Sequence, residues 1–448
     1  MHIVVIGAGE VGSFLAERLS REGHDVAMVE RDPERLEALT RRVDVLGVRG
    51  GGASPAALRD ARVDRSALTV AVTDVDETNM LACKLAKQLG AKAAMARIES
   101  PELRAATSSQ IRHDMGIDLV IDPDAETAEQ ILELLEFPGT AEVAKMAGGD
   151  LVVIGARIPA HAPFVGHTLA EIAAEHEPNW DFLFGAIIRG DQTIIPRGNH
   201  RIEVDDFIRI VCKTKARREI LSQLGLGMSA PKRVLVLGGG RIGSAVAEHL
   251  SRRRAQVVVI DRDPERVEQL GRTLDKAIVV QGEITDDELL HQEGVAAADA
   301  VIALTGEDDA NVLACIYAKS AGARETIAVA HRLELLPLLR EVGIDVALSP
   351  RTASANAVLR FVRGGVAAVS TVLEGEAEVI ELEVMPDSAA DGALIAELRL
   401  PKEGVVLGGV VRDGKGQIAR GRTTLRSRDH VIIFGMPHAL EVIKPIFG

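Results

Sequence analysis

One pattern of residues occurs twice in this chain, and it constrains the fold more than any other feature. HIVVIGAGEVGSFLAERL at the N-terminus returns as RVLVLGGGRIGSAVAEHL in the second half. Gly7 matches Gly238 and Glu30 matches Asp261, both at an offset of 231 residues. An offset of this length indicates a tandem duplication of a large unit, because solenoid repeats are much shorter.

Each half begins with short apolar runs that alternate with helical patterns. Strand and helix alternation of this kind predicts a parallel sheet with helices on both faces. In the first half we expect strands at residues 2–6, 26–30, 45–48, 68–72, 93–98 and 117–121.

The pattern then changes in both halves to a helix followed by strands and turns. In the first half TAEQILELLE predicts a helix that ends at Pro138-Gly139, and LVVIGARI, FGAIIRG and DFIRIVCK predict strands. In the second half a helix around ASANAVLRF is broken at Gly364-Gly365, and strands are predicted in VIELEVM, GGVVRDGKG and HVIIFG. The breaks are candidate hinges, because a few residues there can absorb large changes of backbone angle.

The predicted fold class is therefore α/β, with two tandem Rossmann-type, doubly wound parallel sheets, each followed by a small α+β domain. The predicted parts are a first sheet domain at 1–123, a linking helix and hinge at 124–140, a small domain at 141–225, a linker at 226–232, a second sheet domain at 233–350, a linking helix and hinge at 351–371 and a second small domain at 372–448.

Charge and composition exclude some partners. With 52 Lys and Arg against 66 Asp and Glu, the net charge is −14, which disfavours binding to a phosphate backbone. Aromatic residues make up only 2% of the chain, so there are few side chains on which the bases of a single-stranded nucleic acid could stack. We expect no nucleic-acid partner.

Two further patterns bear on location and metals. The chain starts directly with a predicted strand and its apolar runs are too short to cross a bilayer, so we expect a cytoplasmic protein with at most a peripheral membrane role. The three cysteines form no CxxC pair, so no metal site and no disulfide framework is predicted. Cys83 and Cys315, at matching places, are expected to be small buried helical residues.

The first glycine pattern has the spacing of a dinucleotide-binding turn. Gly7 permits the tight turn, Gly9 lets the backbone approach a pyrophosphate, and Gly12 lets the helix pack closely on the strand. The helix N-terminus then faces the phosphates, and Glu30 at the end of the second strand would accept hydrogen bonds from ribose hydroxyls. Candidate cofactor-binding residues are Gly7, Ala8, Gly9, Glu10, Val11, Gly12 and Glu30.

The second half repeats the whole arrangement with other side chains. Its candidate residues are Gly238, Gly239, Gly240, Arg241, Ile242, Gly243 and Asp261. A carboxylate in both halves, where a 2′-phosphate would sit, favours NAD or an adenine nucleotide over NADP. Arg31 and Arg262, which follow these carboxylates, are also candidates and would tolerate additional phosphate.

Other candidates lie where strands of the sheets end, because ligands of open α/β sheets bind there. These are Thr73-Asp74, Asn79 and Arg97 in the first half and Thr305-Gly306 and Asn311 in the second. Helix capping is the alternative for the asparagine segments. A surface charge is the alternative for Arg97, and Val329 takes its place in the second half.

The two loops differ at one charged position, which is Glu10 in the first and Arg241 in the second. A cation beside the phosphates favours a ligand with more negative charge. We therefore hypothesise that the second site accepts ATP or ADP better than the first.

No catalytic residues are predicted. A dehydrogenase needs a proton donor or acceptor beside the nicotinamide, but no His, Lys or Tyr is repeated within the glycine loops themselves. The acidic run in RIEVDDF contains Glu203, Asp205 and Asp206, which suggests a cation site as one alternative. Its counterpart in SRDHVI keeps only Asp429, so we expect a solvated turn before a strand. Two loops without a repeated proton relay favour two ligand sensors over an enzyme.

The chain resembles the TrkA family, the cytosolic regulatory subunits of bacterial Trk potassium uptake systems, which contain two tandem RCK units. The resemblance rests on MHIVVIGAGEVG with VERDPERL, on RVLVLGGGRIG with VIDRDPERVEQL, and on the order of the four domains. It implies that the small modules are RCK C-terminal domains and that NAD(H), with ATP or ADP as further ligands, binds the candidate residues.

The resemblance also implies partners and a place of action. The family's proteins form a homo-oligomeric gating ring, a dimer or tetramer of chains, beneath a membrane subunit that translocates potassium, at the inner face of the plasma membrane. A soluble NAD-dependent oxidoreductase and a structural scaffold with degenerate loops are the alternatives. Turnover of a nucleotide would favour the first, and absence of nucleotide binding the second.

Overall fold

The structure, a computed structural model, describes residues 1–448 except 107–108, 179, 228, 254, 363–376 and 402–403. Contacts divide the chain into two compact units, each with one copy of the glycine pattern. The first comprises Met1–Thr127, His331–Leu333 and Leu348–Val362, and the second comprises Ala128–Ala330, Glu334–Ala347 and Arg363–Gly448.

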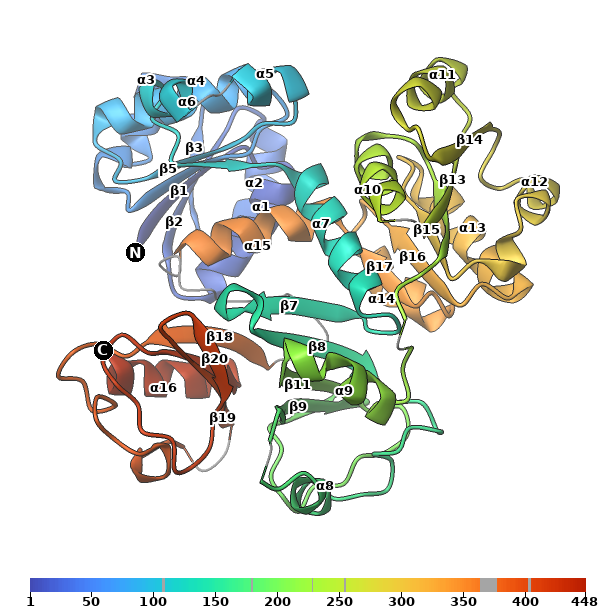
Figure 1. The fold of residues 1–448 in the computed structure, drawn as a ribbon. Helices are drawn as coiled ribbons and strands as arrows, with labels where there is room; N and C mark the ends of the chain where they lie inside the picture. Colours follow the sequence, from blue (N-terminus) through green and yellow to red (C-terminus); the bar gives the residue numbers. More distant parts are fainter. Residues whose placement is uncertain (107–108, 179, 228, 254, 363–376, 402–403) are drawn as a thin grey trace. The chain divides into compact units, whose positions relative to one another are not determined.

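A six-stranded parallel sheet forms the centre of the first unit (Figure 1), with strand order β3-β2-β1-β4-β5-β6. Its strands are β1 (His2–Ile6), β2 (Asp25–Glu30), β3 (Leu46–Arg49), β4 (Leu68–Ala71), β5 (Ala94–Arg97) and β6 (Leu119–Ile121). All six overlap the predicted strands. The order reverses beside β1, and this switch point is where open α/β sheets bind ligands.

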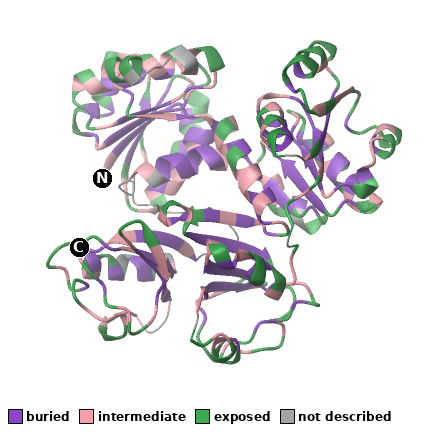
Figure 2. Ribbon diagram, in the orientation of Figure 1, coloured by how far each residue is buried: buried purple, intermediate pink, exposed green. Residues whose placement is uncertain are grey.

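Helices cover both faces of this sheet, since successive residues of β1 point in opposite directions. Ile3 and Val5 lie in one hydrophobic cluster, whereas Val4 and Ile6 lie in another. The strands are accordingly buried and the outer helix surfaces exposed (Figure 2). The helices are α1 (Glu10–Arg21), α2 (Pro33–Thr40), α3 (Pro55–Asp60), α4 (Asp76–Leu89), α5 (Pro101–Ala106) and α6 (Ser109–Asp114).

One helix of the first unit comes from the second half of the chain. Helix α15 (Pro350–Val362) packs against α1, and its Val358 and Leu359 are buried in the same cluster as Leu15 and Leu19 of α1. The sequence predicted this helix but not its place. The first sheet domain therefore includes an element that is more than 200 residues away in the sequence.

The second unit contains the matching parallel sheet, with order β14-β13-β12-β15-β16-β17. Its strands are β12 (Arg233–Leu237), β13 (Gln256–Asp261), β14 (Ala277–Gln281), β15 (Ala300–Ala303), β16 (Glu325–Val329) and β17 (Val346–Leu348). Its helices are α10 (Arg241–Arg252), α11 (Pro264–Thr273), α12 (Asp287–Gln292), α13 (Asp308–Ala321) and α14 (Leu335–Glu341). The predicted fold class is confirmed, with two Rossmann-type sheets of identical topology.

Two antiparallel sheets, also in the second unit, form the small domains. Their orders are β10-β9-β11-β8-β7 and β18-β21-β19-β20. The strands are β7 (Glu142–Met146), β8 (Leu151–Arg157), β9 (Phe182–Arg189), β10 (Gln192–Ile194), β11 (Phe207–Lys213), β18 (Glu378–Glu383), β19 (Val405–Arg412), β20 (Lys415–Ile418) and β21 (His430–Gly435). The accompanying helices are α7 (Pro123–Glu136), α8 (Leu169–Glu175), α9 (Arg217–Gln223) and α16 (Pro437–Phe447). Strands β7 and β10 were not predicted.

The two small sheets share one core. Val211 of the first and Phe434 of the second belong to the same hydrophobic cluster. A Cβ added to Gly185 of the first sheet would lie 2.2 Å from the Phe434 ring, and one added to Gly408 of the second sheet would lie 2.9 Å from Val211. Both glycines are therefore needed for the close approach of the sheets.

The predicted solvated turn in RIEVDDF is confirmed for Glu203 and Asp205, which are exposed, but is wrong for Asp206. Asp206 is only 1% exposed and receives two hydrogen bonds from Arg189, at 2.7 Å and 2.8 Å. Asp429 forms the same pair with Arg412, at 2.8 Å and 2.6 Å. The duplicated acid is thus buried, and it ties the first residues of one strand to the end of a neighbouring strand.

Other expectations concern hinges, cysteines and metals. Gly139 follows α7 with a φ of +82°, whereas Gly364-Gly365 lies outside the described residues.

Cys83 and Cys315 are buried helical residues, as predicted, and burial raises the pKa of each thiol to about 12. Among the described residues, no helix could cross a membrane and no group of His, Cys, Asp and Glu could hold a metal ion.

Candidate functional site

The first glycine loop connects β1 to α1 and leaves its outer side open. Gly7 has a φ of +102°, and a Cβ on Gly12 would lie 1.8 Å from the Gly7 carbonyl oxygen. At Gly9, by contrast, an added Cβ would meet no atom of the described residues within 4 Å. Two glycines thus shape the turn, whereas the middle one borders open space at the helix N-terminus, where a phosphate group fits.

Glu30 holds this loop from the end of β2. Its side chain is 7% exposed and accepts the N–H of Ala8 at 2.6 Å and the N–H of Asp32 at 2.9 Å. Each carboxylate oxygen has a second lone pair, so the group could also accept hydrogen bonds from a ribose. Glu30 therefore has a structural role that the sequence did not predict, and its contact with a ribose stays a prediction.

The second loop repeats this geometry. Gly238 has a φ of +109°, a Cβ on Gly243 would lie 1.9 Å from the Gly238 oxygen, and Gly240 borders open space. Asp261 accepts the N–H of Gly239 at 2.7 Å. The second half therefore offers the same cradle for a phosphate group.

Asp261 also forms an ion pair with an arginine side chain. Burial alone would raise the pKa of Asp261, but the N–H groups of Asp263 and Gly239 and the Arg266 guanidinium lower it below the ordinary value. Arg266 approaches to 3.2 Å. The carboxylate thus stays ionised and remains an acceptor at neutral pH.

A cavity of about 290 Å³ collects the second group of candidates. The predicted residues that line it are Gly238, Gly240, Asp261, Arg262, Thr305 and Gly306. Its other lining residues are Arg266, Gly282, Glu283, Ile284, Leu304, Glu307 and Ala310, which the sequence did not single out. Gly282 and Glu283 directly follow β14, so the rule that ligands bind at the ends of strands could have identified them. The predicted Gly239, Arg241, Ile242, Gly243 and Asn311 do not line this cavity.

A larger cavity of about 910 Å³ in the second unit has no residue of the glycine loop in its wall. It is lined by Pro138–Ala141 beside the first small domain and by residues at the start of β16, including Glu325. Size alone therefore does not identify the nucleotide site, and the backbone geometry of the loops is the better guide.

Asn79 and Asn311 connect neighbouring strand ends. Asn79 is fully buried; its Oδ1 accepts the N–H and hydroxyl of Thr73, and its Nδ2 donates to the carbonyls of Thr73 and Arg97. Asn311 makes the same four bonds with Thr305 and Val329. The helices begin instead after Val75 and Glu307, without a side-chain cap, so the capping alternative is wrong. These contacts favour a positioning role over direct cofactor binding.

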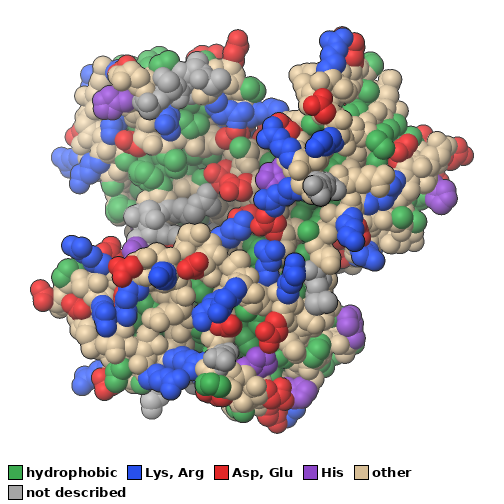
Figure 3. Space-filling model, viewed as in Figure 1, with side chains coloured by type: hydrophobic (Ala, Val, Ile, Leu, Met, Phe, Trp, Pro, Cys, Tyr) green, Lys and Arg blue, Asp and Glu red, His purple; other side chains and the backbone are tan. Residues whose placement is uncertain are grey.

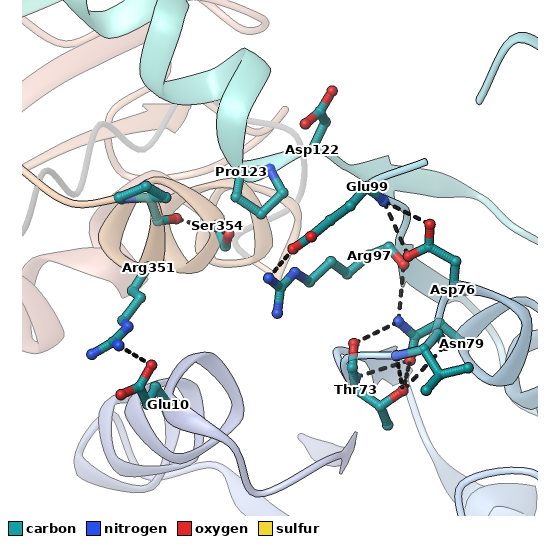
Figure 4. Close-up of polar contacts among 12 residues, drawn as sticks. Glu10, Thr73, Asp76, Asn79, Arg97, Glu99, Asp122, Pro123, Arg351 and Ser354 are labelled. Carbon is teal, nitrogen blue, oxygen red and sulfur yellow. Dashed lines mark hydrogen bonds and ion pairs between the residues drawn. The ribbon is translucent and has the colours of Figure 1, made fainter. Parts of the chain in front are cut away.

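Arg97 lies at the end of β5 and pairs with Glu99 two residues later (Figure 4). The loop that carries Glu99 is itself fixed, because Asp76 accepts the N–H groups of Glu99 and Ser100 at 3.0 Å and 2.7 Å. The Arg97 side chain is 23% exposed. Arg97 is thus held near the carboxyl ends of the central strands, while the equivalent Val329 is buried in the second half.

The charged candidates at the edges of the sites have protein partners. Glu10 forms an ion pair with Arg351 of α15 (Figure 4). No sequence pattern suggested this pair. Arg262 pairs with Glu307 at 2.8 Å. Arg31 and Asp74 are exposed, and Ala8, Val11 and Ile242 are buried, so the last three can offer a ligand only their backbone.

Surface charge is mixed on the face that Figure 3 shows, where Lys and Arg side chains alternate with Asp and Glu side chains. A surface of this kind differs from the continuous basic face that a nucleic-acid backbone requires.

Comparison with known proteins identifies both parts of each half. The TrkA-N domain family matches residues 3–132 and 234–350, and the TrkA-C domain family matches residues 153–225 and 379–448. The chain is 33% identical over 439 residues to the Trk system potassium uptake protein TrkA of Halomonas elongata, covering 97% of this chain and 95% of that protein.

An archaeal relative and a solved structure are also similar over the whole chain. The TrkA homolog of Archaeoglobus fulgidus is 33% identical over 447 residues, covering 100% of both chains. The structure of the GsuK channel bound to NAD matches with a TM-score of 0.61 at 19% identity, covering 100% of this chain and 78% of that one. At this identity, the structural match is evidence for the fold alone.

Proposed function

The chain belongs to the TrkA family of Trk potassium uptake systems, and from this membership we propose that it is a cytosolic, nucleotide-sensing regulatory subunit of such a system. In this role it binds NAD(H), or ATP or ADP, and controls a membrane subunit that translocates potassium. It acts as a homo-oligomeric ring at the inner face of the plasma membrane.

One observation carries the nucleotide part of this proposal. Both halves have a strand, a turn of three glycines and a helix, with open space at the middle glycine and a buried carboxylate beside it. The N–H groups of the first helical turn would bind a pyrophosphate, and Glu30 and Asp261 would accept hydrogen bonds from ribose. The GsuK channel, which shares the fold, has been solved bound to NAD, and this similarity adds support.

Regulation follows if the ligand distinguishes two states of the ring. A nucleotide can shift an equilibrium only by the difference between its affinities for the two states. The chain offers an element that would transmit this difference, since α15 packs against α1, the helix that begins at the first loop. Binding without consumption of the ligand is what such a device requires.

The test is calorimetric titration of NADH, NAD and ATP into the purified chain, with Gly9→Asp and Gly240→Asp variants. Both glycines have extended backbone angles that aspartate adopts readily, and aspartate is a favourable N-cap, so the variants should fold. Their carboxylates would occupy the place of a phosphate group. We expect each variant to lose at least tenfold in affinity at one site only, and NADH to be recovered unchanged.

Gly9→Ser and Gly240→Ser are the matched controls, because they add a small side chain without the charge. Steady oxidation of NADH by the wild-type protein would contradict the proposal, as would identical binding by the wild-type protein and the double aspartate variant.

A further inference from the structure

We propose that Arg351, supplied by the second half of the chain, binds the phosphate groups of the nucleotide at the first glycine loop, and that Glu10 competes with these phosphates for it. This inference rests on the proposed function, since it assumes that the first loop binds a nucleotide. It adds a residue that determines which nucleotide that site prefers.

The position of Arg351 is fixed by the helix that carries it. The first turn of α15 is anchored by Ser349, which is fully buried, and by Ser354, whose hydroxyl donates to the Pro350 carbonyl at 2.9 Å. One turn further, Ala355 and Val358 are buried against the first sheet domain. The Arg351 side chain is only 14% exposed. A guanidinium held in this way loses little conformational entropy when it binds an anion.

The partner of Arg351 marks where this guanidinium lies. Glu10 is the first residue of α1, and Gly9 caps that helix without a side-chain hydrogen bond. The N–H groups of the first turn of a helix have no partner within the helix and form the expected phosphate site. Arg351 contacts the carboxylate of Glu10 (Figure 4). The distance from its guanidinium to that phosphate site is therefore no more than about the length of a glutamate side chain.

The two members of the pair differ in freedom. Arg351 is mostly enclosed, whereas the Glu10 side chain is 63% exposed and can turn into solvent at little cost. A phosphate group forms strong bidentate hydrogen bonds with an arginine and can therefore replace the carboxylate. Glu10 then remains near the ligand and repels additional negative charge, which limits the advantage of ADP or ATP over NAD(H).

The positions that match Glu10 and Arg351 in the duplicated sequence carry side chains of the opposite charge. Arg241 takes the place of Glu10 in the second loop, and α7 begins Pro123-Asp124 where α15 begins Pro350-Arg351. The exchange of both signs together indicates that these positions serve as a charge pair. The preference for ADP therefore cannot be read from Glu10 and Arg241 alone, since Arg351 supplies the first site with a cation.

The experiment measures dissociation constants of ADP and NADH by calorimetry in the Gly240→Asp background, which leaves only the first site. We expect Arg351→Gln to weaken ADP about tenfold and NADH by less, because ADP carries the more strongly charged terminal phosphate. Arg351→Lys should recover part of the ADP affinity. Glu10→Gln should strengthen ADP several-fold, with a smaller effect on NADH.

Matched controls are Arg21→Gln and Glu17→Gln at the other end of α1. Arg21 and Glu17 pair with each other at 2.6 Å. Their variants change the net charge by the same amounts as Arg351→Gln and Glu10→Gln, but away from the N-terminus of α1. They should leave both dissociation constants unchanged. Thermal unfolding of each variant checks that α15 is still folded onto α1.

Outcomes that contradict the inference can be separated from those that contradict the proposed function. If the Gly240→Asp protein binds NADH and ADP but a folded Arg351→Gln variant binds both equally well, Arg351 has only a structural role and the inference is wrong. An equal loss in Arg21→Gln would also overturn it. If the Gly240→Asp protein binds no nucleotide, the first loop is not a nucleotide site and both proposals fail.

Discussion

Glu325 is a single residue whose ionisation should be visible in the stability of the protein. It begins β16, is 6% exposed and accepts the N–H of Gly139 at 3.2 Å. Burial raises the pKa of Glu325 to about 7; the Gly139 hydrogen bond and Lys319 oppose this effect, and Asp345 adds to it. The folded state therefore keeps a proton that the unfolded chain releases at lower pH.

The sign of the effect follows from proton linkage. Between the ordinary glutamate pKa and about 7 the folded state binds more protons, so stability falls as pH rises through this range and then stays constant. We expect Glu325→Gln to match the wild type near pH 5 and to exceed its free energy of unfolding by about 3 kcal/mol near pH 8. Urea unfolding at the two pH values measures this difference. A difference that does not change with pH would contradict the prediction.

The residue scale also shows how far sequence reasoning extends. The roles of Gly7 and Gly12 followed from spacing alone, because a positive φ and a close approach leave no space for a side chain. Asn79 was identified as a candidate, but its role in connecting two strand ends was not. This role depends on hydrogen bonds to Thr73 and Arg97, which are far from each other in the sequence. Arg351 could not be predicted at all, because it reaches the first loop from another domain of the sequence.

Among the elements, strands β7 and β11 of the first small domain are joined by a buried ion pair. Arg209 and Glu142 are 2% and 5% exposed, and the Arg209 Nε lies 2.8 Å from Glu142 Oε2. Arg209 also donates to the carbonyl of Ala377, next to β18 of the second small domain, at 2.6 Å. The pair thus stabilises one sheet and connects it to the other.

Removal of one partner should be costly. We expect Arg209→Met to lower the free energy of unfolding by about 3 to 5 kcal/mol, because it leaves the Glu142 carboxylate buried and unpaired. The double change Arg209→Met with Glu142→Leu should be milder. Arg252→Met removes an exposed pair with Glu248 and serves as the control, with an effect below about 1 kcal/mol. Equal effects of Arg209→Met and Arg252→Met in urea unfolding would contradict this account.

Element order was the most predictable level of the structure. Apolar periodicity located the strands of the first parallel sheet and the helices that became α7 and α15, because these signals are local. Strands β7 and β10 were missed, since EVAKM and QTI are short and partly exposed. The contact of α15 with α1 was missed for a different reason, because nothing in a helix sequence specifies which of two similar domains it covers.

At the scale of the whole molecule, the duplicated pattern corresponds to two TrkA-N and two TrkA-C domains. The resemblance to TrkA proteins is confirmed by full-length identity, and membership in a family of potassium-uptake proteins confirms that the chain is not an enzyme. That membership also accounts for the absence of a repeated proton relay beside the glycine loops. If both loops bind a nucleotide and the chains form a ring, as we propose, the response depends on several nucleotides at once.

The most direct test of nucleotide control is potassium flux through the membrane subunit, reconstituted in vesicles with this chain. We predict that NADH or ADP changes the flux when the wild-type chain is present, and that the change is lost with the Gly9→Asp and Gly240→Asp double variant although this variant still binds the membrane subunit. A flux that is the same with and without nucleotide, for the wild-type chain, would contradict the account.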